Sequence, residues 1–127
     1  MNEEIRLVIP AEEDFRPIAH LVTGGLAVRL DLTYDDLDDV QVGLGTVLGL
    51  RDDDDDLTVV LGLGEGMLHT SVGPFRERAL RELDEDDGEL GLRRVLETVT
   101  DSFEVEQRED GAWIELTKRI AAPAGAT

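Results

Sequence analysis

The sequence has 127 residues, enough for one domain, and its 30 acidic residues outnumber 12 basic ones, giving a formal net charge of −18. So acidic a protein repels the phosphates of nucleic acids and of anionic membranes, and direct binding to either is not expected. The absence of cysteine excludes disulfides, thiolate metal sites and thiol nucleophiles. No secretion signal or bilayer-spanning apolar run is recognisable, so we expect a cytoplasmic protein.

The first third of the sequence predicts a strand and two helices. Residues 5–9 read as a short strand that Pro10 ends, because proline cannot donate to a β-ladder. The helix after it has apolar residues at the spacing of one helical face. These residues are Phe15, Ile18, Ala19, Val22 and Leu26. Thr33, with Asp36 three residues later, suits the start of the second helix. Its apolar stripe comprises Leu37, Val40, Leu44 and Val47.

Three glycines, at positions 43, 45 and 49, interrupt the second helical pattern. Each costs a helix about 1 kcal/mol relative to alanine, so this helix requires tertiary support or a packing reason for its glycines. The aspartate run Asp52–Asp56 follows. Its spacing does not fit a calcium loop, because apolar residues fall where the turn glycine belongs. We interpret the run as a solvated loop that binds divalent cations only adventitiously.

A β-hairpin and two helices are predicted next. Residues 57–63 and 67–72 have the pattern of two strands joined by a glycine-rich turn. A short helix is expected after Pro74, followed by a mobile acidic segment. Apolar residues then return to helical spacing over 90–101.

A second hairpin completes the predicted fold. Residues 103–108 and 112–118 form its strands around Asp110-Gly111, a strong turn signal. The order of elements predicts an α+β fold, a two-layer sandwich in which a mixed or antiparallel sheet packs against helices. The predicted boundaries are 1–120 for a single domain and 121–127 for a disordered tail.

The residue types that usually carry catalysis or metal binding are sparse. His20 and His69 have no partner at metal-ligand spacing. We interpret His20 as a boundary residue of the first helix and His69 as facing solvent or a cross-strand acid. The glycine-rich stretches lack a phosphate-loop lysine, and no serine sits in a nucleophile-elbow setting. Trp113 is interpreted as a sheet anchor rather than a partner hot spot.

Two long segments resemble the anti-sigma-factor serine kinases of the histidine-kinase-like, or Bergerat-fold, ATPase superfamily. The segment "RLVIPAEEDFRPIAHLVTGGLAVRLDLTYDDLDDVQVGL" resembles that family's first strand and paired helices. The segment "VLETVTDSFEVEQREDGAWIELTKRI" is similar to its final helix and hairpin. The residues in register are Val95, Leu96, Val99, Asp101 and Phe103. The resemblance covers roughly residues 5–120 and implies the family's fold.

The same resemblance implies where a nucleotide site would lie. In that family the second helix carries a general-base glutamate and, four residues later, an asparagine that helps to hold magnesium. Extending the register from Asp39 places these positions on Thr46 and Leu50, which supply neither a base nor a metal-binding oxygen. The aspartate that reads adenine falls near Gly73. A remnant of the glycine motif before the last helix consists of Gly88 and Gly91, with Gly91 about one residue out of register.

The preferred hypothesis is therefore a non-catalytic regulatory binding module, a pseudokinase with a degenerate ATP site and no metal site or cofactor, acting in transcription or stress signalling. The resemblance implies a sigma factor or an anti-anti-sigma domain as partner, and a homodimer, since family members commonly dimerise. One alternative is an active ATP-binding serine kinase and anti-sigma factor that uses a divergent site, with ATP and magnesium as cofactors. Another is a self-associating domain whose old pocket holds a different small molecule.

Overall fold

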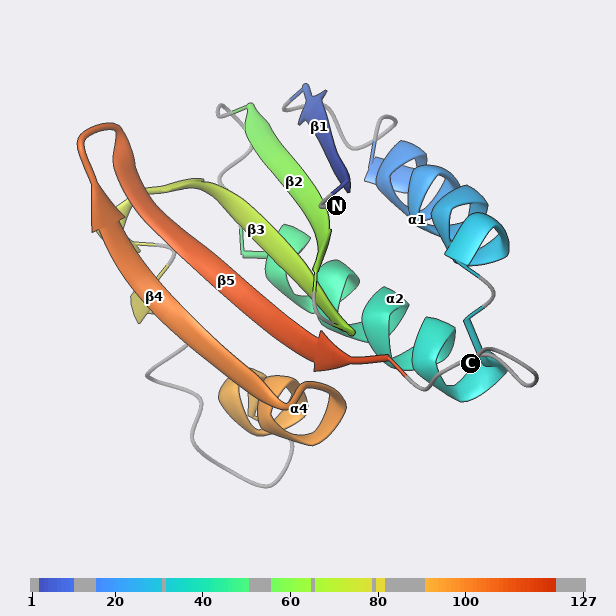
Figure 1. Cartoon of the computed structure of the whole chain (residues 1–127). Helices are drawn as coiled ribbons and strands as arrows, with labels where there is room; N and C mark the ends of the chain where they lie inside the picture. The colour runs from blue at the N-terminus through green and yellow to red at the C-terminus, as the bar shows by residue number, and fades with distance from the viewer. Residues whose placement is uncertain are drawn as a thin grey trace.

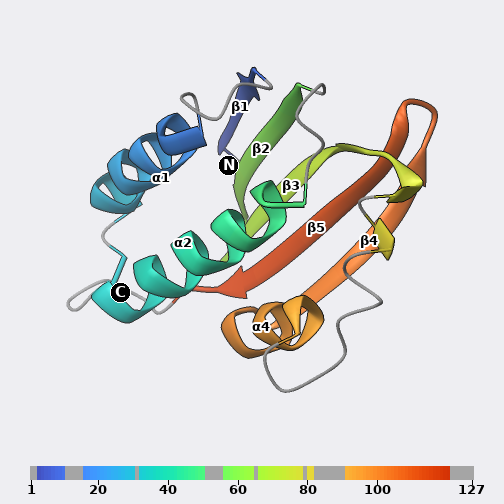
Figure 2. The ribbon, with the colours of Figure 1, turned by 180° about the vertical axis from the view of Figure 1, so that it is seen from behind.

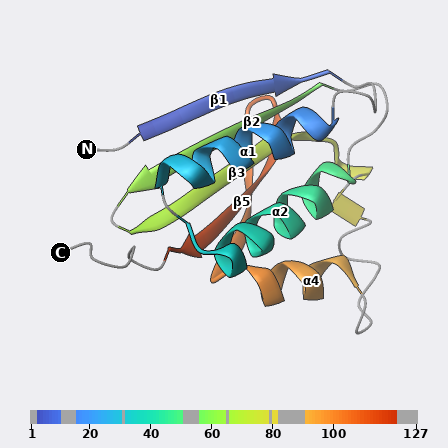
Figure 3. The same ribbon diagram turned by 90° about the vertical axis from the view of Figure 1, so that its right-hand side faces the viewer.

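One antiparallel sheet lies against a layer of helices in the computed structural model (Figure 1). The structure describes residues 3–10, 16–30, 32–50, 56–64, 66–78, 80–81 and 91–120. Within these residues the strands are β1 (Glu3–Ile9), β2 (Leu57–Gly64), β3 (Met67–Phe75), β4 (Ser102–Arg108) and β5 (Gly111–Arg119). The helices are α1 (Arg16–Leu30), α2 (Tyr34–Leu48) and α4 (Leu92–Val99). The predicted α+β class and the two-layer arrangement are confirmed (Figure 3).

The strand order across the sheet is β1-β2-β3-β5-β4, and every neighbouring pair is antiparallel. Both predicted hairpins are present, as β2–β3 and β4–β5. In the second hairpin Arg108 pairs with Gly111, so the turn residues are Glu109 and Asp110. The turn therefore lies one residue earlier than predicted, and Gly111, with φ of +140°, begins β5.

The hydrophobic core lies between the sheet and the helices. Alternate strand residues face it, since side chains of a strand point to opposite faces in turn. From β2, β3 and β5 these include Leu57, Val59, Leu61, Leu68, Val72, Ile114 and Leu116. The predicted stripe of α2 is confirmed, with Val40, Leu44 and Val47 buried and Leu37 half-buried. Burying each leucine contributes roughly 1.5–3 kcal/mol.

The buried face of α1 is largely the predicted one. Ala19 and Leu26 are buried and Val22 packs against the core as expected, whereas Ile18 is 38 % exposed. Thr23 is also buried, and its hydroxyl donates to the Ala19 carbonyl at 2.8 Å. Phe15 lies outside the described residues.

The start and the glycines of α2 follow from identifiable contacts. The Thr33 hydroxyl accepts a hydrogen bond from the Asp36 N–H at 3.1 Å, which confirms the predicted N-cap. A Cβ at Gly43 would lie 3.4 Å from a methyl group of Leu116, and one at Gly45 would lie 3.4 Å from the His20 ring. Both distances are ordinary van der Waals contacts, so a methyl group would fit at either position, and the packing of α2 against the core offsets the helix-propensity cost of its glycines.

Some of the remaining predicted elements lie outside the described residues. Residues 77–78 and 80–81 are helical, but β3 continues to Phe75, so the short helix begins later than predicted. The helix predicted over 90–101 is confirmed as α4, with shorter bounds. Most of the aspartate run, the acidic segment before α4 and the 121–127 tail lie outside the described residues. Within the described part of the chain, every helix is too short or too polar to span a bilayer.

Candidate functional site

The helices that the resemblance assigns to a nucleotide site, α2 and α4, lie side by side (Figure 2). At Gly43 the backbone of α2 is close to both α4 and β5. A Cβ there would lie 3.5 Å from the Cγ2 atom of Val99 and 3.9 Å from that of Thr100. Apolar groups from α4 and β5 therefore fill the space next to this part of α2.

Thr46 and Leu50 do not lie together on a continuous helix. Thr46 is in the last turn of α2, and its hydroxyl donates to the Val42 carbonyl of the same helix at 2.8 Å. The helix ends at Leu48, and Leu50 follows in a turn. The Leu50 side chain is 2 % exposed and belongs to the hydrophobic core. Neither position presents a carboxylate or an amide toward α4.

Gly73 lies on the other side of the sheet from these two positions. A Cβ at position 73 would meet Trp113, whose neighbours Ala112 and Ile114 face the core, so position 73 points to the opposite face. A Cβ at position 73 would lie 2.6 Å from the Cδ2 atom of Trp113 and 3.0 Å from the Ala112 carbonyl oxygen. The structure thus does not bring Gly73 together with the end of α2, and Trp113 leaves no room there for a side chain.

Trp113 is held in place by two contacts, in agreement with its interpretation as an anchor. It is buried, and its indole N–H donates to the Asp110 carboxylate at 2.9 Å. The Arg108 guanidinium lies 4.5 Å from the centre of its ring.

Only one of the two glycines of the predicted remnant motif is among the described residues. Gly88 lies outside the described residues. Gly91 is the N-cap of α4, and its carbonyl accepts a hydrogen bond from the Val95 N–H at 3.1 Å. Its φ of −65° is open to any residue, so the helix start does not itself require glycine here.

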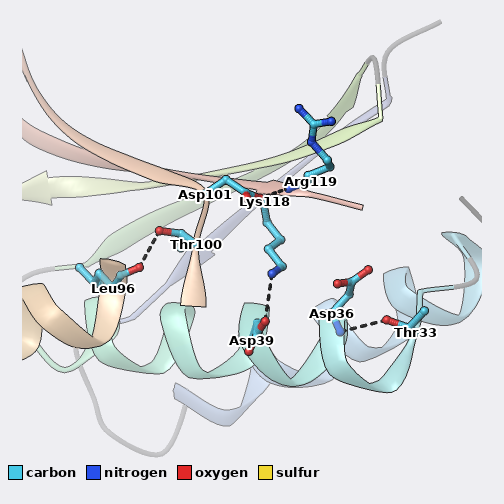
Figure 4. A network of polar contacts seen from close by, with 8 residues as sticks. All are labelled: Thr33, Asp36, Asp39, Leu96, Thr100, Asp101, Lys118 and Arg119. Atoms are coloured by element: carbon cyan, nitrogen blue, oxygen red, sulfur yellow. Dashed lines mark hydrogen bonds and ion pairs between the residues drawn. The ribbon is translucent and has the colours of Figure 1, made fainter. Parts of the chain in front are cut away.

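Two polar side chains that the sequence analysis did not assign point from the sheet toward the helices. Thr70 of β3 is buried and pairs with Leu116 of β5 on the core face. Lys118 of β5 donates from Nζ to the Asp39 carboxylate of α2 at 2.9 Å (Figure 4). The sequence already indicated that Lys118 points toward the helices, because it follows Leu116 by two residues and therefore shares its face of the strand.

Asp101 fixes the end of the same strand. Its carboxylate accepts a hydrogen bond from the Arg119 N–H (Figure 4). Its own N–H donates to the Thr117 carbonyl at 2.9 Å. This aspartate is one of the residues that match the family pattern. Its contacts here tie the link between α4 and β4 to β5.

The pKa of Lys118 is raised above its ordinary value of 10.5, mainly because its amine donates a hydrogen bond to the Asp39 carboxylate. Partial burial opposes this effect, while the negative charges of Asp39, Asp101 and Asp36 add to it. A raised pKa in the folded state means that folding favours the protonated amine. The resulting stabilisation is present in full below pH 10.5 and is lost as the pH rises through the folded-state pKa.

We expect Lys118→Met to lower the free energy of unfolding by about 1 kcal/mol at neutral pH, because it removes a charged hydrogen bond that is partly screened by solvent. Urea unfolding of both proteins across the alkaline range measures this difference. The difference should shrink once the pH exceeds the folded-state pKa of Lys118. A difference that stays constant through that range would show that the ion pair is not its source.

The histidines occupy the structural roles assigned to them. His20 is half-buried between α1 and α2, with its Nδ1 at hydrogen-bond distance from the Gln41 side chain. His69 lies 3.7 Å from the Glu115 carboxylate on the neighbouring strand, which confirms its pairing with a cross-strand acid. Among the described residues, no three histidine, aspartate or glutamate side chains are grouped so that they could hold a metal ion.

A surface hollow of about 350 Å³ lies where α4 meets β4. Its lining consists of Arg93, Glu97, Thr100, Asp101, Ser102 and Phe103. The Arg93 guanidinium lies 5.3 Å from the centre of the Phe103 ring. With two carboxylates in the wall, this hollow is electrostatically unsuited to a triphosphate.

Comparison with known proteins gives relatives along nearly the whole sequence, although no family model matches it. The serine-protein kinase RsbW of Bacillus mycoides (strain KBAB4) is 25% identical over 141 residues, covering 93% of this chain and 86% of the relative. RsbW of Bacillus cereus (strain B4264) gives the same values. RsbW of Bacillus anthracis is 24% identical over the same shares of the two chains.

A solved structure shows that the fold is shared as well. The crystal structure of the RsbU and RsbW domains of Rv1364c from Mycobacterium tuberculosis matches with a TM-score of 0.67 at 15% identity. The match covers 95% of this chain and 33% of the other, so this chain corresponds to about a third of that protein. The resemblance drawn from the sequence is confirmed by these matches.

Proposed function

We propose that residues 1–120 of this chain, which is homologous to the RsbW serine-protein kinases and has their fold, form a regulatory module of the anti-sigma-factor type. This module binds a protein partner and transfers no phosphate. The burial of Leu50 in the core is the observation that carries this proposal. At position 50, where the resemblance implies the family's magnesium-binding asparagine, an apolar side chain packs against other apolar side chains.

The packing around α2 supports the same proposal. Next to Gly43, methyl groups of Val99 and Leu116 occupy the space between the two helices and the sheet. The hydroxyl of Thr46 is bonded to the carbonyl of its own helix rather than directed at a substrate. A general base must instead reach the proton that it removes, and it needs a pKa suited to accepting that proton.

Magnesium and ATP, which the fold family implies, do not fit the residues described in this region. Magnesium takes oxygen ligands, mainly carboxylates and water, in octahedral geometry. The Asp39 carboxylate of α2 is already bound to Lys118, and positions 46 and 50 carry no carboxylate or amide. The proposal therefore contains no phosphoryl-transfer step.

We expect isothermal calorimetry to detect no binding of ATP in the presence of magnesium. A bound nucleotide at 100 times its Kd would stabilise the fold by about 2.7 kcal/mol, so the Tm should also be unchanged by ATP. RsbW of Bacillus cereus, assayed in parallel, is the positive control. ATP-dependent heat and a raised Tm for this chain would refute the proposed loss of nucleotide binding.

A phosphate-transfer assay tests the active-kinase alternative. Incubation with labelled ATP and an anti-anti-sigma domain would transfer phosphate to a serine if catalysis used other acids of this chain. Under our proposal no label appears on that domain, although the two proteins form a complex. Transfer of label to that domain, with or without a complex stable to gel filtration, would refute the proposal in favour of an enzyme.

The proposed partner is a sigma factor or an anti-anti-sigma domain. The charge of −18 suits a partner with a basic face and promotes fast association at low salt. Copurification of the tagged chain from its native host, followed by mass spectrometry, should recover a protein of one of these two classes. Binding of the purified pair would then weaken as salt is raised. Recovery of neither class would refute this choice of partner.

A further inference from the structure

The outer edge of β4 is open to pairing with another extended chain. β4 stands last in the strand order, so this edge has no neighbour among the described strands (Figure 1). An edge strand presents a row of backbone N–H and C=O groups that can bond to a strand laid beside it. Six of the seven residues of β4 are exposed, and Phe103 is half-buried. Nearly the whole strand is thus within reach of a partner.

The two faces of β4 differ in chemistry. Phe103 and Val105 pair with core residues of β5, so they point to the helix side of the sheet. Val105 is nevertheless 39 % exposed. Glu104 and Glu106 alternate with them and point to the face opposite the helices. A strand added to this edge would therefore meet apolar side chains on one face and carboxylates on the other.

Glu104 has an unbalanced negative charge. It lies directly opposite Glu115 of β5, and like charges in that arrangement destabilise a sheet. Glu106 is bonded to Arg108 at 3.2 Å, whereas Glu104 makes no ion pair within the described part of the chain. His69, 3.7 Å from Glu115, supplies a positive charge only when protonated. A cation placed on the outer side of Glu104 would offset the repulsion between the two glutamates.

The hollow where α4 meets β4 extends this acidic surface at one end of the strand. Its volume of about 350 Å³ is enclosed in part by the Phe103 ring and by the side chains of Glu97 and Asp101. Long basic side chains lay an apolar stem along such a ring and keep the charged end near carboxylates. Arg93 already does so from within the chain, 5.3 Å from the ring centre. The hollow thus suits a lysine or arginine of a bound segment.

We propose that β4 is the docking site for an extended, basic segment of a partner protein, which adds to the sheet as a further strand. This inference rests on the proposed function and names the surface that binds its protein partner. Every second residue of the segment is lysine or arginine and faces Glu104 and Glu106. The residues between them are apolar and face Phe103 and Val105. Backbone hydrogen bonds hold the segment, and the charges select it.

The test measures the fluorescence anisotropy of a labelled seven-residue peptide in which four lysines alternate with three valines. We expect it to bind the full chain at about 0.15 M salt, where charges more than roughly 8 Å apart are largely screened. A peptide with the same residues in two blocks has the same charge but cannot place lysine on one face and valine on the other. It should bind at least about tenfold more weakly.

Two variants of the chain locate the peptide. Glu104→Lys should weaken binding about tenfold, because repulsion replaces attraction at the centre of the edge. The variant should stay folded, since a lysine opposite Glu115 is favourable. Glu4→Lys makes the same change of net charge on the opposite edge strand, β1, and should bind the peptide like the unaltered chain. Circular dichroism checks that both variants are folded.

Two results would overturn the proposal. Equal affinities for the alternating and the block peptide, or equal losses in the two variants, would mean that the peptide responds only to the overall charge of −18. The absence of measurable binding would overturn it as well. Because the peptide assay uses neither ATP nor the native partner, its failure is distinct from a failure of the proposed function.

Discussion

Replacing Gly73 by alanine is expected to lower the free energy of unfolding by about 3 kcal/mol, because the added methyl group has no space. It would lie 2.6 Å from the Cδ2 atom and 2.7 Å from the Cγ atom of Trp113. The indole cannot move aside easily, since Asp110 accepts its N–H and Arg108 lies over its ring. The midpoint of urea unfolding, with its slope, measures the loss.

Gly24→Ala is the matched control for this substitution. The nearest atom to a Cβ at position 24 is 4.0 Å away, on Gln41. In the interior of α1, alanine should therefore stabilise the protein by about 0.5–1 kcal/mol. If Gly73→Ala left the free energy of unfolding unchanged, the Trp113 side chain would have to be able to adopt another position. Gly73→Asp, which introduces the residue type that the resemblance implies near this position, should be more destabilising still, because its side chain is larger than that of alanine.

Leu50→Asn, which introduces the residue that the resemblance implies at this position, is expected to cost about 3 kcal/mol of stability and to produce no nucleotide binding. The substitution removes apolar contacts from the core and buries an amide there. Urea unfolding gives the stability, and calorimetry with ATP and magnesium, run while the variant is still folded, gives the binding.

Leu50→Met keeps the volume and the apolar character of the side chain and should cost less than about 1.5 kcal/mol. The contrast between the two variants isolates the polarity of position 50. A stable Leu50→Asn protein that binds ATP with magnesium would mean that position 50 opens onto a nucleotide volume. That result would refute the proposed function.

The fold could be predicted because local signals agreed with one another. Turn residues separated the alternating strands of both hairpins, and Thr33 with Asp36 defined the start of α2. On α1 the periodicity placed Ala19, Val22 and Leu26 correctly, whereas Ile18, at the border of the predicted face, is exposed. Periodicity gives the direction of an apolar face, but not how far the neighbouring elements cover its border.

The candidate site was harder to predict because it depends on where elements end and on contacts between distant residues. The strand predicted to stop at residue 72 continues to Phe75, and only this extension fixes the face to which Gly73 points. The bond between Lys118 and Asp39 joins residues 79 positions apart. No local pattern specifies such a pair, although the alternation of β5 placed Lys118 on the correct face.

Lys118 is the sole lysine of the sequence, and its amine is committed to α2. A reagent that acylates amines has a single side-chain target in this chain, and it reacts with the neutral amine, the form that the ion pair disfavours. Labelling at Lys118 should thus be slow in the native protein and should accelerate on unfolding. The rate of that reaction would report how often the end of β5 separates from the helix beneath it.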